Sequence, residues 1–122
     1  MRTCLVADDS AVIRKVARRI IEGLEFEVVE AEDGAMALDA CRRRLPDVVL
    51  VDARMPVMDG YEFLRHMRNL MGGDRPIVIF CTTENDVAQL ARAKHIGASG
   101  YLMKPFDGEI VTEKFRELEL VG

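Results

Sequence analysis

The segment Val48-Val49-Leu50-Val51-Asp52 indicates the fold class, because it is a short, wholly apolar run that ends in a carboxylate. Valine-rich runs of this length favour a β-strand, and a strand with no alternating polar side is buried on both faces. Such strands are typical of parallel sheets that carry helices on each side. This segment therefore predicts an α/β protein.

Outward from this segment, strand-like runs alternate with longer amphipathic stretches. Strands are expected at residues 4–7, 27–31, 48–51, 77–81 and 100–103. The first helix is expected to have Ser10 as its N-terminal cap and to be followed by Gly23, as a C-terminal glycine. Further helices are expected from about Ala35 to before Pro46, from Gly60 to about Met71, after Asp86 to Gly97, and from about Asp107. The apolar residues expected to face inward include Val12, Ile13, Val16, Ile20, Ile21, Leu38, Leu64, Met71, Val87, Leu90, Ala91, Ile110 and Phe115. Five strand–helix units predict a parallel sheet with right-handed crossovers and helices on both faces.

Length and composition fit one globular domain over residues 1–122. The chain is 49% hydrophobic and 31% charged, which excludes disordered and low-complexity chains. Seventeen basic and twenty-one acidic residues give a net charge of −4, which argues against a nucleic-acid backbone binder. The cysteines Cys4, Cys41 and Cys81 show no metal-ligand spacing and are expected to be free thiols that pack in the core. No run is long enough for a membrane helix and no signal peptide is apparent, so a cytoplasmic protein without membrane insertion is expected.

Polar residues follow four of the predicted strands at the point where each strand ends. They are Asp8-Asp9, Asp52, Thr82-Thr83 and Lys104-Pro105. The carboxyl ends of parallel strands lie at one edge of the sheet, where ligands bind. We therefore expect these side chains to converge, although they are far apart in the sequence.

Converging carboxylates repel one another and need a compensating charge. At an effective dielectric near 20, one pair at ~4 Å costs roughly 4 kcal/mol. Oxygen ligands of this kind favour Mg²⁺, Ca²⁺ or Mn²⁺, and Mg²⁺ keeps water positions open for phosphate oxygens. With the Lys104 ammonium and the Thr82 hydroxyl, the set forms a site for a phosphoryl group with Asp52 as nucleophile. Alone, Asp8-Asp9 is equally well explained as a helix cap.

Several motifs make the chain resemble a response-regulator receiver domain over essentially its whole length. The matching segments are Asp8-Asp9-Ser10, Asp52-Ala53-Arg54-Met55-Pro56-Val57-Met58-Asp59-Gly60, Thr82, Gly97-Ala98-Ser99-Gly100-Tyr101 and Lys104-Pro105-Phe106. The Met-Pro-x-Met-Asp-Gly segment is highly specific in this context. The resemblance implies a flavodoxin-like (βα)5 three-layer sandwich with strand order 2-1-3-4-5. It also implies a single receiver domain over residues 1–122, without an output domain.

The resemblance implies a role for each site residue. Asp52 would accept phosphate from a sensor histidine kinase or a histidine phosphotransfer protein. Asp9, Asp52 and the backbone carbonyl of Arg54 would bind magnesium, with Asp8 contributing through water. Thr82 and Lys104 would contact the phosphoryl group.

The resemblance also implies a switch near the fifth strand. Tyr101 matches a position whose ring turns inward on activation, and Lys104-Pro105 matches a bond that is usually cis. Glu84 and Arg54 flank the site and either form an ion pair that slows hydrolysis or remain two solvated charges. Thr83 occupies a position that often holds a smaller residue, so its side chain is expected to narrow access.

The sequence thus predicts a stand-alone response regulator of two-component signalling that acts through protein–protein contacts at its last two helices and fifth strand. The downstream target is a flagellar motor component, a kinase or a relay protein, and the chain is expected to be a monomer that does not bind DNA.

An aspartate-nucleophile magnesium phosphatase is the alternative function, although Arg54 stands where such enzymes usually carry an acid–base aspartate. A nucleotide or flavin module lacks its glycine-rich motif. The basic runs Arg14-Lys15, Arg18-Arg19 and Arg42-Arg43-Arg44 are interpreted as solvated helix faces.

Overall fold

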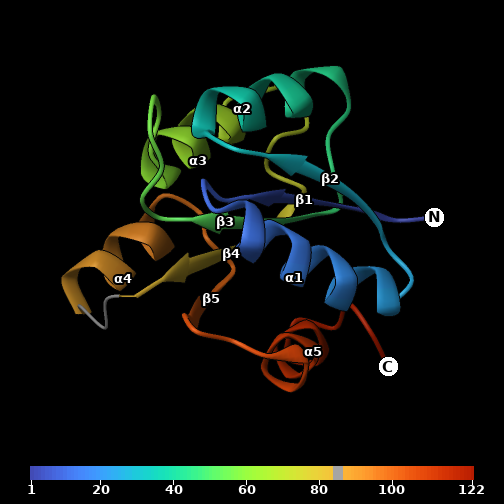
Figure 1. Cartoon of the computed structure of the whole chain (residues 1–122). Coiled ribbons are helices and arrows are strands. Elements are labelled where there is room, and N and C mark those ends of the chain that lie inside the picture. Colours follow the sequence, from blue (N-terminus) through green and yellow to red (C-terminus); the bar gives the residue numbers. More distant parts are fainter. Residues whose placement is uncertain (84–86) are drawn as a thin grey trace.

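The computed structural model describes residues 1–83 and 87–122, and within them the chain forms a five-stranded parallel sheet with helices on both faces (Figure 1). The strands are β1 (Thr3–Ala7), β2 (Glu27–Ala31), β3 (Val48–Asp52), β4 (Ile77–Thr82) and β5 (Gly100–Met103). The helices are α1 (Ala11–Gly23), α2 (Gly34–Arg43), α3 (Gly60–Arg68), α4 (Val87–His95) and α5 (Gly108–Glu117). The strand order is β2-β1-β3-β4-β5, which confirms the predicted fold.

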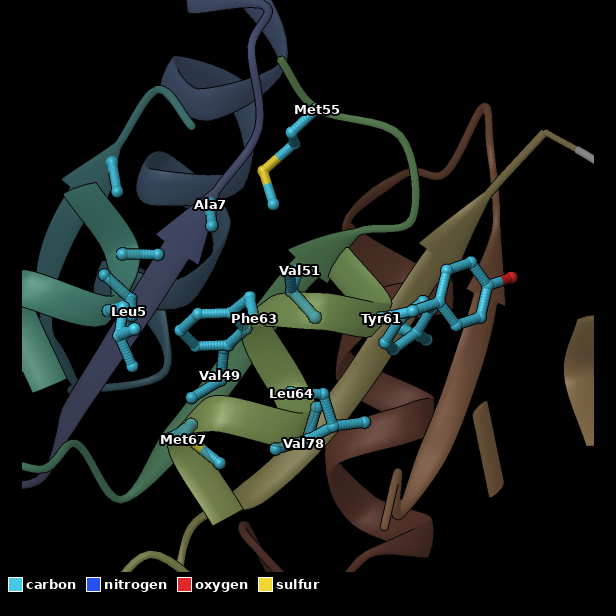
Figure 2. Close-up of a cluster of buried hydrophobic side chains, with 14 of the residues drawn as sticks. Leu5, Ala7, Val49, Val51, Met55, Tyr61, Phe63, Leu64, Met67 and Val78 are labelled. Carbon is cyan, nitrogen blue, oxygen red and sulfur yellow. The ribbon is translucent and has the colours of Figure 1, made fainter. Parts of the chain in front are cut away.

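The strands are buried as their apolar sequences predicted, because helices cover both faces of the sheet. Every residue of β1 and β3 is buried, whereas the edge strand β2 alternates between exposed and buried positions. Helices α1 and α5 cover one face, and their core partners include Val6, Leu50 and Ile79. Helices α2, α3 and α4 cover the other face. Figure 2 shows Phe63 of α3 beside Val49 and Val51 of β3, and Leu64 of the same helix beside Val78 of β4.

Side-chain caps fix where the helices begin. Ser10 Oγ accepts a hydrogen bond from the Ile13 amide at 3.3 Å, as the sequence predicted. Asp33, Asp59 and Asp107 cap α2, α3 and α5 in the same way. Such caps satisfy amide groups that have no partner in the first helical turn. Asp59 therefore sets the start of the helix that follows the loop after Asp52.

The predicted inward faces of the helices were partly wrong. Residues expected inside but exposed in the structure are Val12, Val16, Met71, Val87, Ala91 and Ile110. In α1 the buried residues are Ile21, as expected, and Ala17, which was not expected to face inward and lies one helical turn before it. Spacing alone leaves the rotation of a helix about its axis undetermined, and small alanines pack closest to the sheet. Gly23 was also expected just beyond α1, but it is the last residue of that helix, and Glu25 adopts the left-handed conformation with φ 68°.

The cysteines lie in the core as free thiols, which confirms their predicted packing role. Burial raises the pKa of the Cys41 thiol to about 12, and it raises the pKa values of Cys4 and Cys81 as well. These thiols are therefore protonated and unreactive at neutral pH. Across the described ranges, no helix has the length and apolar character needed to cross a bilayer.

Arg68 joins three separate parts of the chain. From α3 its guanidinium donates hydrogen bonds to the carbonyls of Gly73 at 3.0 Å and Pro76 at 2.8 Å, and to the carbonyl of Gly97. It therefore holds the turn before β4 and the turn before β5 against the same helix.

Arg68→Met is expected to lower the free energy of unfolding by about 2–3 kcal/mol, because it leaves partly buried carbonyls without their charged donor. Urea unfolding measures this loss. Arg65→Met on the exposed side of the same helix is the control and is expected to change stability by less than ~0.5 kcal/mol. Equal losses in the two variants would show that the carbonyl contacts are not stabilising.

Candidate functional site

The predicted strand-end residues meet at one edge of the sheet. Asp8 and Asp9 follow β1, Asp52 ends β3, Thr82 ends β4 and Lys104 follows β5. The parallel register places these ends side by side, with Ala7 opposite Val51, Asp52 opposite Cys81 and Thr82 opposite Met103. The convergence that the alternation of elements predicted is therefore present in the structure.

The carboxylates of Asp8, Asp9 and Asp52 form a tight cluster. Their oxygens lie within 4.8 Å of one another. Asp8 is 3% exposed and Asp52 is 9% exposed, whereas Asp9 faces solvent. A cluster of oxygen ligands that is closed on one side and open on the other fits a hard divalent cation such as Mg²⁺, which retains water ligands.

Lys104 supplies the positive charge inside this cluster. Its Nζ lies 2.5 Å from Asp8 Oδ2 and 3.2 Å from Asp52 Oδ2, and its side chain is 13% exposed. Burial lowers the pKa of Lys104, but the hydrogen bond to Asp8 and the charge of Asp52 outweigh burial and raise it overall. Lys104 is therefore a stable cation beside both carboxylates.

The environment of Asp52 is less favourable for its charge. Burial raises the pKa of Asp52 above its usual value, the Lys104 charge lowers it in part, and the neighbouring Asp8 raises it further. Its Oδ1 accepts one long hydrogen bond of 3.4 Å from the Arg54 amide. Asp52 is thus a weakly solvated carboxylate, and a further cation would stabilise its charged form.

Backbone and side-chain hydrogen bonds hold the Asp8 loop in place. The Ser10 amide donates to Asp8 Oδ1 at 2.9 Å, and Arg14 Nη1 donates to the Asp8 carbonyl at 2.6 Å. Arg14 also pairs with Glu30 at 3.1 Å, and Arg18 pairs with the same carboxylate at 2.7 Å. The Arg14 side chain is only 15% exposed, so the prediction that Arg14 lies on a solvated helix face was wrong. The reason is that β2 lies next to β1 and brings Glu30 up to α1.

Glu30→Gln tests the strength of this network. Burial raises the pKa of Glu30, but the hydrogen bonds from Arg18 and Arg14 outweigh burial and lower it from its ordinary 4.5. A lowered pKa means that the pairing stabilises the fold above pH 4.5 and is lost as the pH falls through the folded-state pKa. We expect the variant to lose about 1 kcal/mol at pH 7 in urea unfolding.

The difference between wild type and Glu30→Gln is expected to shrink as the pH falls below 4.5. Glu22→Gln is the control, since Glu22 also pairs with Arg18 but is half exposed. A stability difference for Glu30→Gln that stays constant with pH would contradict a charge-based role for this network.

The remaining predicted site residues lie around the cluster in different environments. Thr82 is half-buried, Thr83 and Arg54 are exposed, and Glu84 lies outside the described residues. Tyr101 on β5 is 43% exposed, so its side chain lies at the surface. The Lys104–Pro105 peptide bond is cis, in agreement with the resemblance.

An open hollow next to the cluster contains residues that the sequence did not single out. It is lined by Asp9, Arg54 and Asp59, and by Gln89 and Arg92 of α4, among others. The Arg92 guanidinium stacks on the Tyr61 ring at 4.2 Å from its centroid. No sequence signal identifies these α4 residues, because they reach the site only through the packing of α4 against α3.

Comparisons with known proteins agree with this geometry. Residues 4–116 match the response regulator receiver domain. The chemotaxis protein CheY of Halobacterium salinarum is 33% identical over 115 residues, which cover 93% of this chain and 93% of that protein. The structure of chemotaxis protein CheY4 of Vibrio cholerae has a TM-score of 0.91 and 32% identity, covering 96% of this chain and 98% of that one.

A third relative bears on the carboxylate cluster. The receiver domain of a sensor histidine kinase from Pseudomonas aeruginosa, solved with a magnesium ion in its active-site cleft, has a TM-score of 0.86 and 27% identity, with 95% of each chain covered. Other curated relatives are longer, and this chain spans 43% of one and 49% of another. On the match over residues 4–116 and the shared fold, the chain belongs to the response regulator receiver domain family.

Proposed function

We propose that the chain is a phosphorylation switch in which Asp52 accepts a phosphoryl group from a phosphohistidine of a sensor histidine kinase or a histidine phosphotransfer protein. The observation that carries this proposal is the position of Lys104, whose Nζ contacts Asp52 at 3.2 Å and Asp8 at 2.5 Å within the carboxylate cluster. Receiver domains as a family support the same reaction class. Transfer from a purified, phosphorylated histidine phosphotransfer domain to this chain tests the proposal, and no transfer to Asp52 would refute it.

The proposed reaction is an in-line displacement at phosphorus. An Asp52 carboxylate oxygen attacks the phosphorus, the N–P bond breaks, and its electron pair returns to the departing imidazole. Asp8, Asp9 and Asp52 have the ligand chemistry to hold Mg²⁺, which supplies charge neutralisation for the phosphoryl oxygens when bound. Lys104 already lies beside Asp52, so it can pair with a phosphoryl oxygen after only a small displacement.

The proposed output uses Thr82, Tyr101 and the surface formed by α4, β5 and α5. Phosphorylation adds about 1.5–2 negative charges and three acceptor oxygens next to Thr82 and Lys104. The backbone amide of Lys104 donates to the Thr82 carbonyl at 2.9 Å, so movement of Thr82 is transmitted directly to the end of β5. Tyr101 is exposed on that strand and is the proposed readout. Its ring is expected to become less accessible in the phosphorylated protein.

The proposed partners are the phosphoryl donor and one downstream protein, which is a flagellar motor component, a regulated kinase or the next relay carrier. A relay carrier passes its phosphoryl group to a second histidine protein, whereas the other two targets bind the phosphorylated form without removing the group. Pull-down and phosphotransfer with the same candidate separate these cases. The stand-alone, monomeric and cytoplasmic states stay predictions from the sequence.

A multiple-turnover phosphatase is the competing function, and Arg54 counts against it. Arg54 stands two residues after Asp52, where such an enzyme needs a carboxylate that transfers protons, and it is exposed. We propose that the chain catalyses only its own phosphorylation and dephosphorylation. Hydrolysis of a small phosphate ester at steady state, with many turnovers per chain, would refute this proposal.

Thr83→Ala is expected to increase the rates of both phosphoryl gain and phosphoryl loss. Thr83 is exposed directly after β4, and the end of β4 pairs with the end of β3 that carries Asp52, so a smaller side chain is expected to widen access for donor and water. A phosphorylation time course with acetyl phosphate measures both rates. Thr83→Ser, which keeps the hydroxyl and removes the methyl group, separates bulk from hydrogen bonding, and unchanged rates in the alanine variant would exclude the steric role.

A further inference from the structure

Within the described residues, Asp9 is the carboxylate of the acidic cluster that has no hydrogen-bond donor. Asp8 accepts hydrogen bonds from the Ser10 amide at 2.9 Å and from Lys104. Asp52 contacts Lys104 at 3.2 Å. Because no side chain in this part of the structure holds the exposed Asp9 carboxylate, its direction depends on the backbone that carries it.

Two hydrogen bonds fix the backbone of Asp8, one on each side of its Cα atom. The Asp8 amide donates to the carbonyl of Ala31, the last residue of β2, at 3.1 Å. The Asp8 carbonyl accepts a hydrogen bond from Arg14 Nη1 at 2.6 Å. This carbonyl belongs to the planar peptide group that joins Asp8 to Asp9, so a fixed carbonyl oxygen also fixes the Asp9 amide nitrogen. Arg14 therefore orients the backbone of Asp9.

Arg14 is itself held in place by both α1 and β2. Its amide donates to the Ser10 carbonyl at 3.0 Å, and its Nε donates to Glu30 Oε1 at 3.1 Å. Glu30 is positioned by the sheet, where it lies opposite Val6 in the register of β1 and β2. A guanidinium can hold a carboxylate and a carbonyl at once, because its N–H donors form a rigid fork. These contacts connect the edge strand to the backbone of Asp9.

The charge of Arg14 and its hydrogen bond have opposite effects on a cation in the cluster. A guanidinium repels Mg²⁺, so removal of the charge alone would strengthen Mg²⁺ binding. Removal of the hydrogen bond frees the peptide group before Asp9, and a ligand that must be ordered on binding gives a lower affinity. The sign of the change in Mg²⁺ affinity therefore distinguishes the two effects.

We propose that Arg14 is a positioning residue, which orients Asp9 for Mg²⁺ through the Asp8 carbonyl and is anchored by Glu30. This inference rests on the proposed function, in which Asp8, Asp9 and Asp52 hold Mg²⁺. Groups that orient metal ligands contribute roughly 10–100-fold to metal affinity. The edge strand β2 thus contributes to the metal site although it supplies no carboxylate to the cluster.

The test is titration of the ¹⁵N-labelled full chain with MgCl₂ at constant ionic strength, followed by amide chemical shifts. Arg14→Met removes the guanidinium and keeps the apolar part of the side chain. It is expected to weaken Mg²⁺ binding about tenfold, the equivalent of ~1.4 kcal/mol. Its Asp9 amide is expected to shift even without Mg²⁺, because the preceding peptide group is released. Arg14→Lys keeps the charge without the planar fork and is expected to have an intermediate affinity.

Arg18→Met is the matched control. Among the described residues, Arg18 pairs with Glu30 at 2.7 Å and with Glu22 at 3.2 Å, and it makes no hydrogen bond to Asp8. This variant is expected to lose stability but to keep the Mg²⁺ affinity and the Asp9 amide shift of the wild type. A role of Arg14 in stability alone would move the unfolding transition and leave both of these readouts unchanged.

Unchanged or tighter Mg²⁺ binding by Arg14→Met, or equal weakening by Arg18→Met, would overturn the positioning role and leave the proposed phosphorylation of Asp52 standing. Absence of Mg²⁺ binding by the wild-type chain would refute the metal site itself, and this inference with it. The wild-type titration therefore separates failure of the proposed function from failure of the role given to Arg14.

Discussion

Asp52→Asn is expected to abolish phosphoryl acceptance, whereas the wild-type chain gains one phosphoryl group in acetyl phosphate and Mg²⁺. An amide oxygen is a far weaker nucleophile than a carboxylate oxygen and cannot form the acyl phosphate. The variant also removes a charge from the cluster in which oxygens of Asp8, Asp9 and Asp52 lie within 4.8 Å, so its affinity for Mg²⁺ is expected to fall. Intact-protein mass spectrometry measures the added phosphoryl group directly.

Asp59→Asn is the matched control for this experiment. Asp59 lies in the loop after Asp52, lines the adjacent hollow, and caps α3 by accepting a hydrogen bond from the Glu62 amide at 2.9 Å. Asparagine caps helices about as well as aspartate, so this variant is expected to fold normally and to accept one phosphoryl group. Phosphorylation of Asp52→Asn to the wild-type level would place the acceptor elsewhere and refute the proposed chemistry.

Lys104→Met is expected to produce the largest loss of stability, roughly 3 kcal/mol in the free energy of unfolding without Mg²⁺. Lys104 is the cation that pairs with Asp8, which is 3% exposed, and with Asp52. Methionine preserves most of the apolar length of the side chain and removes only the charge. The remaining carboxylates then repel each other at a position that water reaches poorly.

Mg²⁺ is expected to recover part of the stability lost in Lys104→Met, because it replaces the missing charge inside the same cluster. Urea unfolding in EDTA and in excess Mg²⁺ measures both effects. Lys114→Met is the control, since Lys114 forms an exposed pair with Glu117 at 2.8 Å on α5 and its loss is expected to cost below ~1 kcal/mol. Equal losses in the two variants, with no recovery by Mg²⁺, would show that Lys104 does not balance the cluster.

Prediction from the sequence worked best where a local pattern and a topological rule agree. Strand-like runs that end in Asp8-Asp9, Asp52 and Lys104 were sufficient to place these residues at one edge, because all parallel strands end on the same side of a sheet. Prediction was less accurate for the side of each helix that faces the core. Val12 and Val16 are exposed although their spacing suits a buried face, because spacing does not define which side of a helix meets the sheet.

The amino-acid sequence by itself determined the alternation of strands and helices, the helix cap at Ser10 and the acidic edge around Asp52, since each depends on neighbouring residues or on a rule common to parallel sheets. Only the tertiary structure decided which charges pair. Glu30 meets Arg14 across 16 residues and Lys104 meets Asp8 across 96, because ion pairs form between groups that packing brings within a few ångströms, whatever their separation along the chain.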